Sequence, residues 1–323
     1  MSTESRAMDD DSAQPGAARS QAAADLAADD DLIHLPPELS PFRRAIRRFL
    51  SHKLALAGFI CLIIMALLAA SQAIVSPFDP EKPHLFKVNR PPDTVNWMGT
   101  DQVGRDVFSR ILQGARVSLS VGIVAVSIYV VIGFIIGSIA GLAGGYIDDA
   151  LMRFTDFVMT FPTFILIIIL AGITGPNIFN IMVIIGIFGW PGLARLFRGN
   201  ILVMRELEYV MASRTLGAGQ RHIISRHILP NIVGPVTVAI TLGVAGAILA
   251  EAGLSFLGFG VTEPAASWGS MINSARGIAF LAGFPWLWIA PGAAISIAVL
   301  SINFMGDGLR DAFDVRGRSQ SGE

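Results

Sequence analysis

The sequence predicts an all-α integral membrane protein with six transmembrane helices. Hydrophobic residues make up 53% of the 323 residues and charged residues only 15%, against about 25% charged in soluble domains. Mean hydropathy is +0.59, and the apolar residues gather in runs long enough to cross the hydrocarbon core as helices. Because a soluble fold this apolar could not keep its surface wet, membrane lipid is the solvent that fits.

The composition also excludes several classes of protein. A formal net charge of −1 provides no basic field, so no nucleic-acid partner is expected. The single cysteine, Cys61, lies inside an apolar run. Neither a disulfide framework nor a cysteine-based metal site is therefore predicted.

Residues 1–40 are predicted to form a disordered acidic cytoplasmic tail, because they carry too little apolar surface to offset their ordering entropy. An acidic docking arm is the alternative. The tail lacks the basic start and apolar stretch of a secretory signal. Its aspartates are Asp9, Asp10, Asp11, Asp25, Asp29, Asp30 and Asp31.

Residues 41–75 combine a basic amphipathic segment, Phe42–Phe49, with the first apolar run, at 54–75. Arginines flanking the start of this run indicate that the N-terminus stays in the cytoplasm. Residues 76–116 are polar and rich in proline, which predicts a loop with a short amphipathic helix at Val107–Gln113; an N-terminus inside places this loop outside.

Residues 117–306 are predicted to form a five-helix core, followed by a cytoplasmic C-terminal tail at 307–323. The apolar runs lie at about 117–142, 154–173, 178–197, 232–254 and 284–305. Lysines and arginines are more frequent in the segments that this topology places inside, and the two later outside loops contain only Arg276. The bias predicts a multi-pass protein with both termini in the cytoplasm.

Small residues and prolines predict how the helices pack. Gly133, Gly137 and Gly141 recur every four residues, a spacing that lets two helix backbones approach closely. Prolines within or near other spans predict kinks, tolerated beside neighbouring helices or a water-filled cavity. They are Pro162, Pro191, Pro235 and Pro291. A packed bundle with a pathway is one interpretation; the other is that both residue types are simply common in membrane helices.

Catalytic, metal and cofactor sites are not expected. No Gly-rich loop precedes any of the three lysines, so the chain cannot be a P-loop ATPase on its own. His222 and His227 are five residues apart, which predicts that they lie on different sides of a helix, as part of a basic surface. Glu251 and Asp156 are the main ionisable residues near the spans. Glu251 could contact a substrate or coupling ion, or pair structurally with backbone or a partner chain.

The longest cytoplasmic loop, 198–231, is predicted to form a helix, a turn and a second helix. Leu207, Val210, Met211 and Arg214 share one helical stripe, and Gly217 and Gly219 supply the stop. Pro230 and Asn231 then mark the start of the fifth span. A short projecting helix could insert into a groove on a partner, or the hairpin could lie on the lipid.

This loop resembles the EAA loop of binding-protein-dependent ABC importer permeases. Met211-Ala212-Ser213 occupies the EAA position, and Gly217 occupies the position of the glycine in the motif. Leu229-Pro230 closes the motif, and His227 stands where the pattern has isoleucine. The lead-in Glu208-Tyr209-Val210 is similar to that of the dipeptide/oligopeptide/nickel branch. Further matches to this branch are Gly99–Arg110, Glu251–Gly260, Trp268-Gly269 and Met305–Asp311. In the connection between the second and third spans the matching residues are Gly144-Gly145, Asp148, Met152-Arg153, Asp156 and Pro162.

The resemblance covers about residues 41–317 and implies a type I importer permease (MetI-like) architecture, as the C-type subunit in the bacterial inner membrane. It implies a heterodimer with a B-type permease, two ABC ATPase subunits and a periplasmic solute-binding protein. The ATPase-coupling residues that it implies are Glu208, Tyr209, Met211, Ala212, Ser213, Arg214, Leu216, Gly217, Ala218, Arg221, Leu229 and Pro230. Asp148, Arg153, Asp156 and Glu251 are candidate structural or pathway residues.

A peptide is the cargo that the resemblance favours, and nickel, glutathione or a sugar-like solute are alternatives in the same class. A self-sufficient carrier or channel would instead transport without partners and respond to ions through Glu251. A membrane enzyme would need a catalytic constellation, which the sequence lacks.

Overall fold

The computed structural model describes residues 41–313, so the predicted tail at 1–40 and the last residues of the predicted tail at 307–323 lie outside them. The chain divides into two compact units, residues 1–44 and 45–323. Helix α2 (Pro41–Ser51) crosses this boundary, and the predicted basic segment is indeed helical. All other described elements belong to the second unit.

The described part of the chain contains five helical runs that could cross a membrane, or six, the predicted number, when the bent pair α6 and α7 counts as one span. Five are single helices or nearly continuous pairs long and apolar enough to cross a membrane, and α6 with α7 makes the sixth, bent by 75°. The spans are α3 (Lys53–Ala70), α5 (Val107–Ala143), α6 (Gly145–Thr160) with α7 (Thr163–Thr174), α8 (Ile178–Phe188) with α9 (Trp190–Arg205), α11 (Gln220–Ile223) through η3 (Ile224–Ile228) to α12 (Leu229–Phe256), and α15 (Trp286–Phe313).

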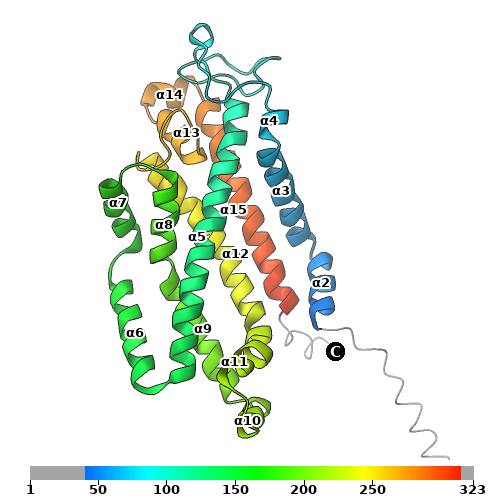
Figure 1. Ribbon diagram of the computed structural model, residues 1–323. Helices are drawn as coiled ribbons and strands as arrows, with labels where there is room; N and C mark the ends of the chain where they lie inside the picture. The colour runs from blue at the N-terminus through cyan, green and yellow to red at the C-terminus, as the bar shows by residue number, and fades with distance from the viewer. Residues whose placement is uncertain (1–40, 314–323) are drawn as a thin grey trace, which may run out of the picture. The chain divides into compact units, whose positions relative to one another are not determined.

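Short elements connect these spans. They are α4 (Gln72–Val75), η2 (Leu85–Lys87), α10 (Glu208–Thr215), α13 (Trp268–Ser274) and α14 (Ile278–Gly283). In Figure 1, α13 and α14 lie at one end of the bundle and α10 at the opposite end. These ends are called the α14 end and the α10 end.

The second, third and fifth spans begin earlier than predicted, at Val107, Gly145 and Gln220 rather than at about 117, 154 and 232. The stretch Val107–Gln113 is not a separate short helix but the start of α5, whose N-cap Asp106 accepts a hydrogen bond from the Ser109 amide. Polar side chains at the start of α5 form hydrogen bonds with the preceding loop, including Ser109 with Asp106 and Gln113 with Glu81. These bonds stabilise a polar stretch of helix ahead of the apolar part of the span. The fifth span likewise begins at Gln220, and a π-helical turn carries the helix through Pro230 without a break.

The prolines differ in their effects. Pro162 is the N-cap of α7, directly at the bend of the third span, and Pro191 lies in the first turn of α9, just after the chain breaks at Gly189. Pro235 and Pro291 instead lie inside α12 and α15, which continue through them. Helix breaks therefore lie at or next to only two of the four prolines for which kinks are predicted.

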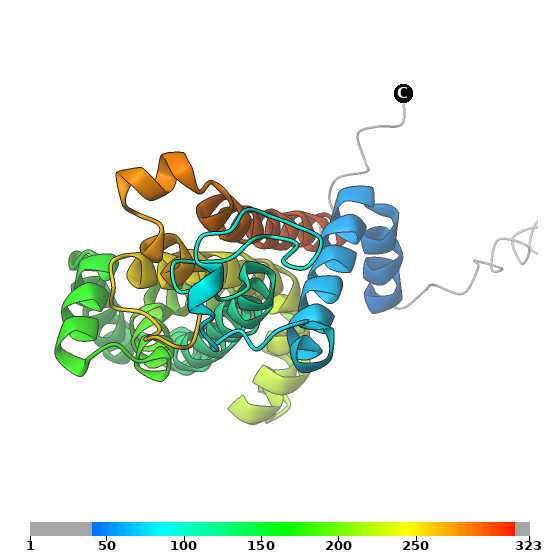
Figure 2. The same ribbon diagram turned by 90° about the horizontal axis from the view of Figure 1, so that it is seen from above.

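Helix α5 is the central helix of the bundle, in contact with α3, α6, α8, α9, α12 and α15. Figure 2 shows α6 to α8 on one side of it and α3 on the other. Gly133, Gly137 and Gly141 face α9, where a Cβ at Gly137 would overlap the carbonyl oxygen of Ala194. The predicted close approach of two backbones at these glycines is confirmed.

Candidate functional site

The segment 206–219, here the α10 segment, projects from the α10 end of the bundle (Figure 1). Its one fully buried side chain is Val210, which belongs to the same core cluster as Ile223 and Ile228. Met211 is 46% exposed and Leu216 is 88% exposed. One valine thus anchors α10 to the bundle, while two large apolar side chains remain on its outer surface.

Helix α10 ends at Gly217, as the sequence predicts. Gly217 has φ +84°, a conformation that costs little only for glycine. Its amide donates to the Arg214 carbonyl at 3.0 Å, and the Ala218 amide donates to the Ser213 carbonyl at 3.1 Å. This pair of bonds is a Schellman cap, which turns the chain sharply into α11.

His222 and His227, which are predicted to lie on different sides of a helix, lie next to each other in the structure. The rings of His222 and His227 are 5.7 Å apart and edge to face, and the Tyr209 ring is also 5.7 Å from His227. The prediction that the histidines lie on different sides of a helix is wrong. The reason is the π-helical turn Ile224–Ile228, because its i to i+5 repeat places residues five apart on one face.

The other residues predicted for the coupling loop all reach the surface of the chain. Ser213 and Ala218 are half-buried, and the exposed ones are Glu208, Tyr209, Ala212, Arg214, Gly217, Arg221, Leu229 and Pro230. Tyr209 also accepts a 3.4 Å hydrogen bond from Asn231. All of the predicted coupling residues are therefore at least partly accessible, most of them on the projecting α10 segment and Leu229 and Pro230 at the start of α12.

Ion pairs join α6 to α9, the helix that leads into the α10 segment. Arg198 donates two hydrogen bonds to Asp148, at 2.5 and 2.7 Å. Arg195 pairs with Asp156 at the surface. Arg153, the third candidate on α6, is exposed. Because α9 leads into α10, these pairs link the third span to the base of the projecting segment.

Glu251 lies in a closed cage rather than on a surface. Its side chain is fully buried and accepts hydrogen bonds from Ser118 at 2.8 Å and from Ser255 at 2.6 Å. Since Ser118 belongs to α5 and Glu251 to α12, the carboxyl group joins two spans. Of the two interpretations from the sequence, this geometry favours the structural one.

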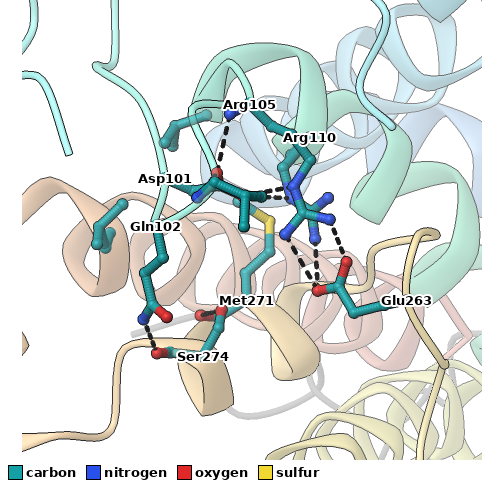
Figure 3. A pocket seen from close by; sticks show the side chains of 10 residues that line it. Asp101, Gln102, Arg105, Arg110, Glu263, Met271 and Ser274 are labelled. Atoms are coloured by element: carbon teal, nitrogen blue, oxygen red, sulfur yellow. Dashed lines mark hydrogen bonds and ion pairs between the residues drawn. The ribbon is translucent and has the colours of Figure 1, made fainter. Parts of the chain in front are cut away.

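A second charged cluster, which the sequence reasoning did not assign, lies at the α14 end (Figure 3). Asp101, Arg105, Arg110 and Glu263, here the charged clamp, line a cavity of about 380 Å³. Arg105 is 2.7 Å from Asp101 and also pairs with Glu263. Arg110 is 3.3 Å from Glu263 and its side chain is only 2% exposed.

The charged clamp joins the loop before α5 to the loop before α13. Burial opposes the charge on Arg105, but hydrogen bonds and charges from Glu263 and Asp101 outweigh it and raise the pKa of the guanidinium. Asp101 and Arg105 are four residues apart, a spacing visible in the sequence. Their partner Glu263 lies more than 150 residues further on, so no local pattern could identify it.

The long apolar helices define a multi-pass membrane protein. Within the described residues no cluster of histidine, cysteine and carboxylate side chains could hold a metal ion. Comparison with known proteins then identifies its kind. Residues 133–319, more than half of the chain, match the family model of the binding-protein-dependent transport system inner membrane component. Residues 40–92 match the N-terminal TM domain of oligopeptide transport permease C.

Individual relatives agree over nearly the whole chain. A provisionally assigned peptide permease of Brucella suis is 46% identical over 87% of this chain and 93% of the relative. The oligopeptide transport system permease protein OppC of Bacillus subtilis is 40% identical over 85% and 90%. The dipeptide transport system permease protein DppC of the same species is 41% identical over 86% and 87%. The chain belongs to the family of binding-protein-dependent transport system inner membrane components.

Proposed function

We propose that this chain is the C-type membrane-spanning subunit of an ATP-driven importer of dipeptides or oligopeptides. The complex would contain a B-type permease, two ABC ATPase subunits and a periplasmic solute-binding protein. ATP hydrolysis would take place on the ATPase subunits, so this chain itself would not be an enzyme. The names of the relatives support peptide cargo, because peptide permeases are among the most similar sequences.

The exposed apolar surface of the α10 segment carries the proposed coupling to the ATPases. Met211 and Leu216 leave large apolar area in water, while Val210 fixes the helix to the bundle. Such a helix fits a hydrophobic groove on a partner. The ATPase subunits would bind this helix, and the ion pairs between α9 and α6 would transmit a movement of the α10 segment to the third span.

We also propose that the α10 end faces the cytoplasm and the α14 end faces the periplasm. Arginines support this orientation, because Arg205, Arg214, Arg221 and Arg226 gather near the α10 segment, and basic residues favour the inner side of the membrane. Cysteines introduced at exposed positions of each end, in a variant without Cys61, would test it. A membrane-impermeant thiol reagent should label only the α14 end in intact cells.

The deciding experiment is reconstitution of the whole complex in proteoliposomes. Labelled dipeptides, longer peptides, glutathione and nickel should be supplied one at a time with the binding protein. We expect ATP-dependent uptake of a peptide by the complex and none by this chain alone. Uptake by the chain alone, or uptake of nickel only, would contradict the proposal. Glutathione is included because a glutathione permease is 38% identical over 87% of this chain.

A further inference from the structure

A groove of about 500 Å³ runs between α5, α7, α9 and α12, apart from the α10 segment and from the charged clamp. It lies beside both helix breaks, because Thr163 begins α7 and Gly189 separates α8 from α9. Small residues of α12 form one wall, and no charged side chain lines it. These residues are Ala239, Gly243, Gly246, Ala247 and Ala250.

Tyr129 lines this groove from the bundle core, and the other polar side chain that lines it, Thr163, is exposed. Tyr129 of α5 is only 7% exposed, and its hydroxyl lies against Gly243, where a Cβ would overlap the oxygen. No hydrogen bond joins this hydroxyl to another residue of the described chain. The hydroxyl is not fully enclosed, so it can donate a hydrogen bond to, or accept one from, a group that enters the groove.

The lining identifies the chemistry of that ligand. Glycine and alanine let a main chain approach closely, and a desolvated peptide amide needs a donor or acceptor such as a tyrosine hydroxyl. We propose that the groove is this chain's wall of the translocation pathway, and that the Tyr129 hydroxyl hydrogen-bonds a main-chain amide of the passing peptide. This inference rests on the proposed function.

Gly246 allows a direct test of the groove. Nothing lies within 4 Å of a Cβ at Gly246 or at Gly292, which belongs to α15 and does not line the groove. Gly246→Leu should reduce peptide uptake by the reconstituted complex about tenfold or more, with ATPase stimulation by the binding protein retained. Gly292→Leu is the matched control and should leave uptake unchanged. Normal uptake by Gly246→Leu would overturn the inference.

Tyr129→Phe tests the hydrogen bond itself. Loss of one neutral hydrogen bond should lower peptide uptake about fivefold, while Tyr146→Phe, at a tyrosine 94% exposed on α6, should have no effect. A peptide in which one amide is replaced by an ester should be transported more slowly by the unsubstituted complex. It should lose no further rate in Tyr129→Phe, and an equal additional loss would contradict the assigned bond.

The outcomes separate this inference from the proposed function. If the unsubstituted complex imports no peptide, the proposed function fails and the peptide contact fails with it. If peptide uptake is normal in the unsubstituted complex and in both variants, only the groove assignment is wrong. If Gly246→Leu prevents the B-type permease from co-purifying, the groove is a subunit interface, and the pathway assignment is overturned.

Discussion

At the scale of single residues, Gly217 sets the direction of the α10 segment. An alanine at φ +84° would be strained by about 1–2 kcal/mol, whereas Gly219, at φ −69°, accepts alanine without strain. Gly217→Ala should weaken both the ATPase activity stimulated by the solute-binding protein and peptide uptake. Gly217→Pro also loses the amide that donates to Arg214, and it should abolish the coupling of ATP hydrolysis to uptake. Gly219→Ala is the control. Normal uptake by Gly217→Pro would refute a coupling role for this turn.

Glu251 permits a second prediction, which separates a structural carboxyl group from a functional one. Glu251→Gln keeps a hydrogen-bonding group for both serines and should cost at most about 1 kcal/mol of stability. Glu251→Leu leaves both hydroxyls without their acceptor and should cost about 2–4 kcal/mol. Thermal unfolding in detergent and peptide uptake should both be measured. A Glu251→Gln variant that is stable but inactive would support a titrating role instead.

The sequence predicts a single residue's role correctly where that role depends on the backbone conformation of the residue itself. Gly217 ends its helix because a turn of this kind requires a positive φ, and the glycine can be read directly. The proximity of His222 and His227 could not be predicted, because it depends on a π-helical turn, whereas an ordinary α-helix places residues five apart on different sides.

At the scale of helices, two ion pairs hold α6 against α9 with different strength. The Asp148 side chain is only 10% exposed and makes two bonds to Arg198, whereas Asp156 is 60% exposed. Asp148→Asn should lower the free energy of unfolding by about 1–3 kcal/mol, and Asp156→Asn by about 0–1 kcal/mol. Thermal unfolding of both variants checks this order, and equal effects would contradict it.

The number of spans could be predicted from hydropathy, because crossing lipid requires long apolar helices. Their starts could not. Helix α5 extends back to Val107 because Asp106 caps it and Arg110 finds carboxylate and carbonyl partners in folded loops. Those partners exist only once the tertiary structure has formed, so the polar turn looks like a loop in the sequence.

At the scale of the whole described molecule, the charged clamp holds two distant loops together. Glu263→Gln would leave Arg105 and Arg110 with one shared carboxylate, Asp101, and uncompensated buried charge is costly. The loop 76–106 should then be cut faster by trypsin and exchange amide hydrogens faster.

Glu81→Gln is the matched control for the clamp variant. Glu81 belongs to the same loop but accepts a hydrogen bond only from neutral Gln113, at the surface. Its replacement should leave the protection of the loop unchanged. If the two variants were cleaved at the same rate, the clamp would not be what holds the loop.

Helix α5 runs unbroken for 37 residues, a length of about 55 Å. It starts beside Arg105 and, over its last turns, lies backbone to backbone with the helix that leads into α10. This continuous helix therefore connects the two ends of the bundle directly. If, as proposed, the binding protein docks at the α14 end and the ATPases dock at the α10 end, each binding event should change the affinity of the other by the same factor.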